Sequence, residues 1–190
     1  MTAPEATERP RQPLLVVALA LLIIVIRSDF RGYDALPDPV AWLLIAVACA
    51  ALPEDVPRRG AVVASAVLAM FASVASWPAK WHERVVDLDP ALAWTIALPS
   101  LAWSALFCLA VAHLARPQLS AHVMWTYVAY GFVAAIFLPI IVFGGGVDSL
   151  EGTYAAIIVL SQVALFALAL MHAWKPWAMI ARTDETPDHH

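Results

Sequence analysis

Six apolar stretches, joined by short polar connections, take up most of the chain. A helix needs roughly 20 apolar residues to cross a hydrocarbon core about 30 Å thick, and every backbone polar group in lipid must be satisfied inside the segment. No stretch alternates as a barrel strand would. The pattern predicts an all-α, polytopic membrane helix bundle with about six transmembrane helices. The six stretches are Leu14–Ile26, Val40–Leu52, Ala61–Trp77, Ala91–Leu114, Val123–Phe143 and Tyr154–Trp174.

The six stretches differ in length. The last three reach spanning length, the third is marginal, and the first two are short. We expect the first two either to extend into polar flanks or to form a shallow hairpin. The first stretch follows Arg9 and Arg11 as in a signal peptide, but no small-residue cleavage pattern comes after it, so we expect it to be retained as a helix.

Composition agrees with a lipid environment. Hydrophobic residues make up 62% of the sequence and charged residues 14%, against about 45–50% and about 25% in soluble domains. The lipid bilayer is therefore the expected partner. The net charge is −4 with no Lys/Arg cluster, which argues against nucleic-acid binding. We expect three parts: a cytoplasmic segment 1–13, a single transmembrane domain 14–177 and a polar tail 178–190.

Charge distribution predicts the orientation. With six crossings, seven of the 11 Lys and Arg residues fall on the side that carries both termini, which the positive-inside rule assigns to the cytoplasm. Tryptophan supports two interfacial belts. We expect Trp42, Trp77, Trp81 and Trp94 at outer helix ends and Trp125, Trp174 and Trp177 at inner ends, with Trp103 well inside a helix.

A stripe of small residues runs along the third stretch. Ala61, Ser65, Ala69 and Ser73 recur at four-residue spacing. Small side chains let helix backbones approach closely in lipid. The stripe predicts a helix packed inside the bundle. The alternative is that the stripe forms the contact surface with a second copy of the chain or with a partner membrane protein.

A charged cluster follows the first stretch and is the candidate binding site. It comprises Arg27, Asp29, Arg31, Asp34 and Asp38. If the first helix continued past Ile26, the two arginines would lie one turn apart on one face. Charges at membrane depth are costly and tend to be paired or functional. The cluster could bind an anionic headgroup or a small ion; a solvated outer loop that ends two helices is the alternative.

The same region carries a resemblance. The segment from Gly32 to Trp42, and on to Ile45, resembles G-[FY]-D-x-L-P-D-x-[IV]-G-[YW]-x-L-I, found near the start of small, uncharacterised, multi-spanning bacterial membrane proteins. Ala41 stands where that pattern usually has glycine. The resemblance implies a bacterial membrane protein whose Leu-Pro-Asp turn is structural, and it implies no activity.

Histidines are the second candidate. His113, His122 and His172 fall near helix ends on the cytoplasmic side and could converge on a metal or haem. No pair is spaced to share one helix face. A charged histidine near a helix C-terminus is also favoured simply because it complements the helix dipole. We therefore expect no metal and no cofactor.

Two function classes remain open from the sequence, and an intramembrane enzyme is the third. The transmembrane stretches hold no Asp, Glu, Lys or Arg at mid-depth, and we find no catalytic or nucleotide-binding motif. A non-enzymatic accessory or assembly component is the favoured hypothesis. The alternative is a small-solute or ion transporter or channel, with the charged cluster as an outward-facing vestibule and Pro99 and Pro139 kinking the gating helices.

Overall fold

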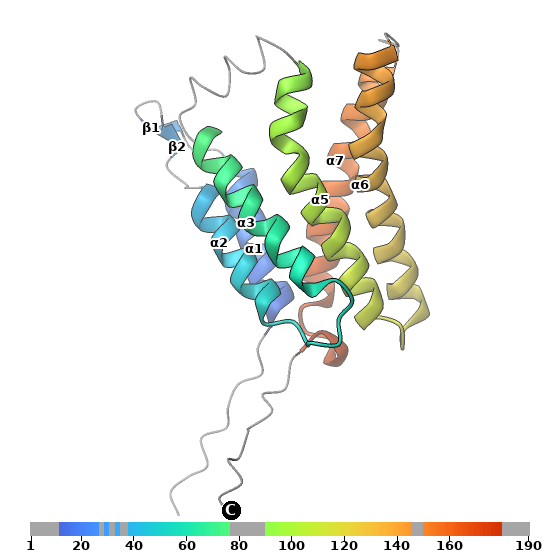
Figure 1. The fold of residues 1–190 in the computed structure, drawn as a ribbon. Helices are drawn as coiled ribbons and strands as arrows, with labels where there is room; N and C mark the ends of the chain where they lie inside the picture. The colour runs from blue at the N-terminus through green and yellow to red at the C-terminus, as the bar shows by residue number, and fades with distance from the viewer. Residues whose placement is uncertain are drawn as a thin grey trace, which may run out of the picture.

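The computed structural model describes residues 12–26, 29–30, 33–34, 38–76, 90–145 and 150–179. Their fold is a bundle of helices with one small hairpin (Figure 1). The helices are α1 (Pro13–Val25), α2 (Asp38–Ala50), α3 (Arg59–Ser76), α5 (Pro90–Leu114), α6 (Leu119–Gly145) and α7 (Glu151–His172), and a 3-10 turn η2 (Pro176–Ala178) follows α7. The prediction of an all-helical bundle is confirmed.

Each helix matches one apolar stretch. Proline begins α1 at Pro13 and α5 at Pro90, where its missing N–H removes no helical hydrogen bond. Pro99 and Pro139 lie inside α5 and α6 without interrupting either helix. Apolar runs without internal breaks thus become continuous helices.

The connection between α1 and α2 differs from the helical extension considered above. α1 ends at Val25, and Ile26 takes an extended conformation. Strands β1 (Asp29–Phe30) and β2 (Tyr33–Asp34) then pair antiparallel, with Asp29 opposite Asp34. The first helix therefore does not continue past Ile26.

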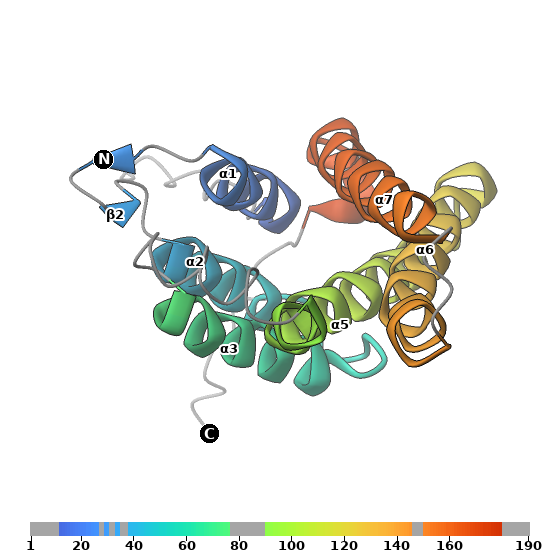
Figure 2. The same ribbon diagram turned by 90° about the horizontal axis from the view of Figure 1, so that it is seen from above.

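Helices adjacent in sequence pack side by side, and α1 packs on α7, so the six elements form a closed series (Figure 2). Directions alternate from one helix to the next (Figure 1). Leu14 at the start of α1, Leu114 at the end of α5 and Ala178 beyond α7 line one depression. The start of α1 and the end of α7 therefore lie at the same end of the bundle.

The helices fall into a short half and a long half. Within the described residues, three helices are long and apolar enough to cross a membrane: Ala91–Leu114, Leu119–Val142 and Gly152–His172. The helices α1 and α2 have 13 residues each, and α3 has 18. Large apolar side chains such as Leu160 and Phe71 are exposed on the outer surface, as expected for a protein in lipid.

Aromatic side chains fill the interior. Trp42 of α2 meets Trp103 of α5 edge-on with ring centroids 5.2 Å apart, and Trp103 stacks on Phe107 at 5.0 Å. Phe107 contacts Trp125 of α6 at 6.1 Å, and Trp125 contacts His172 of α7 at 6.0 Å. The rings thus form a continuous chain across four helices.

This chain corrects the predicted aromatic belts. Trp42 is 6% exposed and Trp125 is 0% exposed, so both rings pack in the protein core rather than on the outer surface, where a belt residue would contact lipid headgroups. Trp174 is exposed, as a belt residue would be. Trp77 and Trp81 lie outside the described residues. Position near a helix end does not distinguish an inward-facing tryptophan from an interfacial one.

The small-residue stripe lies mainly inside the bundle. Ser65, Ala69 and Ser73 are buried, whereas Ala61 is exposed. α3 packs against both α2 and α5. Small side chains allow this close packing on two sides. An oligomer seam through the stripe stays a prediction.

Candidate functional site

The predicted charged cluster is described only in part. Asp29 and Asp34 have paired backbones in the hairpin, and Asp38 begins α2 with a half-buried side chain. Arg27 and Arg31 lie outside the described residues. Binding by this cluster stays a prediction.

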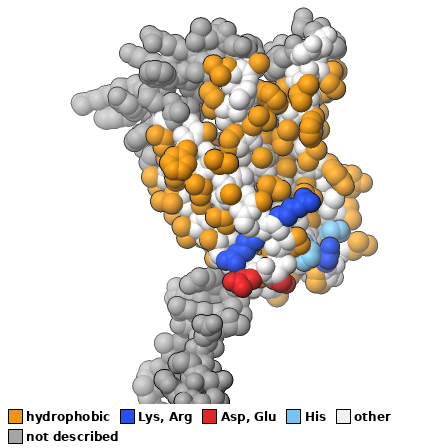
Figure 3. Space-filling model, viewed as in Figure 1, with side chains coloured by type: hydrophobic (Ala, Val, Ile, Leu, Met, Phe, Trp, Pro, Cys, Tyr) orange, Lys and Arg blue, Asp and Glu red, His pale blue; other side chains and the backbone are white. Residues whose placement is uncertain are grey.

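A second charged region lies at the opposite end of the bundle. The four Lys and Arg residues of the described part, Arg58, Arg59, Arg116 and Lys175, all lie in or beside the connections at this end. Glu54 and Asp55 belong to one of the same connections. Figure 3 shows Lys or Arg, Asp or Glu, and His side chains gathered toward the lower end of the described part, below a surface of mostly hydrophobic side chains.

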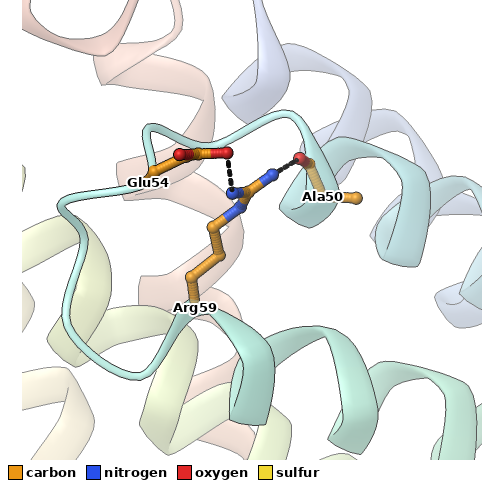
Figure 4. Close-up of polar contacts among 3 residues, drawn as sticks. All are labelled: Ala50, Glu54 and Arg59. Carbon is orange, nitrogen blue, oxygen red and sulfur yellow. Dashed lines mark hydrogen bonds and ion pairs between the residues drawn. The ribbon is translucent and has the colours of Figure 1, made fainter.

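Arg59 stabilises the turn between α2 and α3. Its guanidinium donates a hydrogen bond to the carbonyl oxygen of Ala50, the last residue of α2, and forms an ion pair with Glu54 at 3.6 Å (Figure 4). The last carbonyls of a helix have no partner within it, so the arginine satisfies one of them. The positive charge of Arg59 is therefore paired within the turn by Glu54 and the Ala50 carbonyl.

Arg58 and Arg116 are placed differently. Both side chains are exposed, and within the described residues neither forms an ion pair with a carboxylate. Arg58 has a φ of 60°, which puts an ordinary L-residue in the left-handed region. Such a conformation costs about 1–2 kcal/mol outside glycine. The turn therefore holds, just before α3, a strained arginine that pairs with no carboxylate among the described residues.

These two arginines line an open groove of about 350 Å³ between the α2–α3 connection, α5 and α6. His113 and His122 line it as well, together with the apolar side chains of Leu106 and Leu109. A second depression of about 260 Å³ continues along α6 and shares His122 with the first. The site is basic at the end of the bundle and apolar further along the helices.

The three histidines separate into two environments. His122 Nδ1 lies 2.8 Å from the carbonyl oxygen of Ala112, which can only accept, so Nδ1 carries the hydrogen and Nε2 is left for other contacts. His172 is buried, and its Nδ1 donates to the carbonyl oxygen of Leu168 at 2.9 Å. Only His113 and His122 therefore meet in the groove.

His172 belongs to the aromatic chain instead. Its ring lies between Trp125 and Trp177, with the Trp177 centroid 5.3 Å away. Trp177 Nε1 donates to Oε1 of Gln118 at 3.1 Å, which ties the segment after α7 to the α5–α6 connection. In the residues that the structure describes, no group of three potential ligands is placed to hold a metal.

Hydroxyl groups inside the helices are satisfied locally. Ser104 and Thr126 donate to carbonyl oxygens four residues earlier in their own helices, at 2.9 and 2.8 Å. Ser65 donates in the same way to Ala61 at 2.8 Å. These donors therefore turn back to the backbone of their own helix rather than towards a solute.

Comparison with known proteins adds no identification: no family model, curated protein or solved structure matches the chain. The predicted resemblance of the Gly32–Trp42 segment accordingly stays untested. The groove at the basic end is the feature that sequence reasoning missed. The sequence does place Arg58 and Arg116 in two turns, and His113 and His122 flank the turn that holds Arg116. Whether these side chains come together depends on how the helices pack, which the sequence does not show.

Proposed function

We propose that this chain is a multi-pass protein of a bacterial plasma membrane with six spans and cytoplasmic termini. Three helices of spanning length and the alternating helix directions support the crossings, and the excess of seven Lys and Arg residues out of 11 on the side of the termini supports the orientation. The bacterial assignment rests on the resemblance of the Gly32–Trp42 segment. The basic end of the bundle is then cytoplasmic.

In this membrane the protein acts without catalysis, as an accessory or assembly component. The observation that carries this proposal is the filled interior: Trp103 and Trp125 are fully buried where a conduction path would need polar groups or water. The locally bonded hydroxyls of Ser104 and Thr126 support it further. An apolar exterior, including the exposed Val163 on α7, is left for lipid or for a membrane partner.

The orientation is tested by cysteine labelling of intact cells. A membrane-impermeant maleimide should modify a cysteine at Thr153, at the start of α7, but not one at Glu54, until the cells are opened. The wild-type protein is the control, because Cys49 and Cys108 are both 0% exposed. Labelling of the Glu54 variant in intact cells would contradict the orientation.

The accessory role is tested by flux and by crosslinking. Proteoliposomes should leak K⁺, Cl⁻ and H⁺ no faster than protein-free vesicles; saturable, protein-dependent flux would favour the transporter alternative. A photo-crosslinking residue at the exposed Val163 should give one discrete protein adduct, whereas the same residue at the buried Leu165 should give none. Crosslinks to lipid alone across all exposed positions would contradict the role.

A further inference from the structure

We propose that the groove between the α2–α3 connection, α5 and α6 binds an anionic phospholipid, with the phosphate held by Arg58 and Arg116. This inference rests on the proposed membrane placement, which puts the groove at the cytoplasmic interface. It goes beyond the accessory role because it assigns a ligand class to a site that this role does not require.

The charge of the groove selects an anion. Arg58 and Arg116 both line it, and within the described residues neither is neutralised by a carboxylate. The nearest turn carries Glu54 and Asp55, but Glu54 pairs with Arg59, and neither acid lines the groove. Two guanidinium groups on one cavity match the oxygens of a phosphate.

The backbone conformation of Arg58 also supports a binding role for this residue. A glycine would adopt its φ of 60° without strain, yet the chain has arginine there. Strain that is held at one residue is a pointer to function when the side chain faces a site. Here the strained residue is one of the two cations of the groove.

Two histidines also line the groove. Because His122 Nδ1 is held by the Ala112 carbonyl, its Nε2 is the nitrogen left for other contacts. His113 lines the same cavity from the end of α5. Both imidazole rings therefore border the space that a bound phosphate would occupy.

The apolar continuation distinguishes a lipid from a free anion. Leu106 and Leu109 lie on the α5 side, and the second depression runs along α6 past Val123 to Tyr130. From His122 to Tyr130 is eight residues, about 12 Å along a helix axis. This is the direction in which an acyl chain leaves a headgroup at the interface. A basic pocket between membrane helices on the cytoplasmic side is a recurrent mode of anionic-lipid recognition.

A zwitterionic lipid fits less well. Its headgroup would bring an ammonium next to two arginines, and like charges repel. The proposal therefore commits to a lipid with net negative charge, such as phosphatidylglycerol.

The test is lipid retention by the purified full-length protein, measured by native mass spectrometry. Dioleoyl phosphatidylglycerol should remain bound as one molecule, and dioleoyl phosphatidylcholine should not. The variant Arg58→Gln/Arg116→Gln should bind phosphatidylglycerol about tenfold more weakly or worse, as expected when charge-assisted hydrogen bonds are lost. Lys175→Gln is the matched control, because it removes a charge from the same end outside the groove.

Several outcomes would overturn the proposal. Equal retention of the two lipids would contradict it. Unchanged binding of phosphatidylglycerol by the double variant would also contradict it. Equal thermal stabilisation by inorganic phosphate would replace the lipid with a simple anion. If the double variant fails to fold, the comparison of the two lipids on the wild-type protein at low and high salt decides, because a phosphate contact weakens with ionic strength. Lipid retention does not depend on a protein partner, so it can fail or succeed independently of the accessory role.

Discussion

Gly131 of α6 lies directly against Ser161 of α7. A Cβ added at Gly131 would come within 2.3 Å of Ser161 Oγ and 3.4 Å of Ser161 Cβ. A carbon and an oxygen in ordinary contact lie about 3.3–3.6 Å apart, so the Gly131→Ala variant lacks about 1 Å of space. We expect this substitution to destabilise the packing of α6 on α7.

The magnitude follows from two opposing effects. Alanine in a helix is favoured over glycine by about 1 kcal/mol. Against this, overpacking of α6 against Ser161 of α7 costs about 1–3 kcal/mol. Gly131→Ala should therefore lower the free energy of unfolding by about 0–2 kcal/mol.

Two matched variants isolate the contact. Gly152→Ala is the control, since nothing lies within 4 Å of its added Cβ and only the propensity gain applies. The pair Gly131→Ala/Ser161→Ala removes the hydroxyl that clashes and leaves its Cβ at an ordinary 3.4 Å. We expect a double-mutant coupling of about 1–3 kcal/mol between positions 131 and 161.

The assay is unfolding in detergent, followed by tryptophan fluorescence and circular dichroism. The ranking expected is Gly152→Ala most stable and Gly131→Ala least stable, with the double variant recovering most of the loss. If Gly131→Ala and Gly152→Ala shift stability equally, α6 and α7 do not meet at Gly131 and the reasoning is refuted.

Two further stability predictions follow from the contacts described above. Arg59→Gln should destabilise the protein by about 1–2 kcal/mol because it weakens the hydrogen bond to Ala50, whereas Glu54→Gln should change stability by less than about 1 kcal/mol because Glu54 is 95% exposed. Equal effects of the two in thermal unfolding would contradict a helix-capping role for the arginine. Trp103→Ala should cost about 3–5 kcal/mol through the cavity and two lost ring contacts, against less than about 1 kcal/mol for the exposed Trp174→Ala. Similar unfolding midpoints for these two would mean that the aromatic chain does not support the core.

The helices could be predicted from the sequence because each apolar stretch is bounded by strong local signals. Val40–Leu52 was expected and α2 covers Asp38–Ala50, with Asp38 and Pro39 at its start. Ala91–Leu114 was expected and α5 covers Pro90–Leu114. Prolines and polar residues mark these ends within a residue or two, whatever the tertiary packing.

The interior and the groove could not be predicted in the same way. Whether Trp125 faces lipid or protein depends on the rotation of α6, and an apolar helix surrounded by apolar neighbours gives no polar face to fix that rotation. For the same reason the sequence did not predict that Arg58 and Arg116 line one groove. The charged cluster around Asp38 was visible because its members are close in sequence, and its role stays a prediction.

The unequal lengths of the two halves have a consequence for the surrounding bilayer. Helices of 13 residues span about 20 Å, whereas those of 22 to 27 residues span about 33–40 Å. With the six spans proposed above, lipids beside α1 and α2 would have to shorten or tilt to cover the hydrophobic mismatch, while those beside α5, α6 and α7 would not. The elastic energy of this thinning would be concentrated on one flank and would fall when a second thin-sided protein shares the deformed patch. The membrane itself would then draw partners to the α1–α2 flank and set their orientation before any side chain of the two proteins touches.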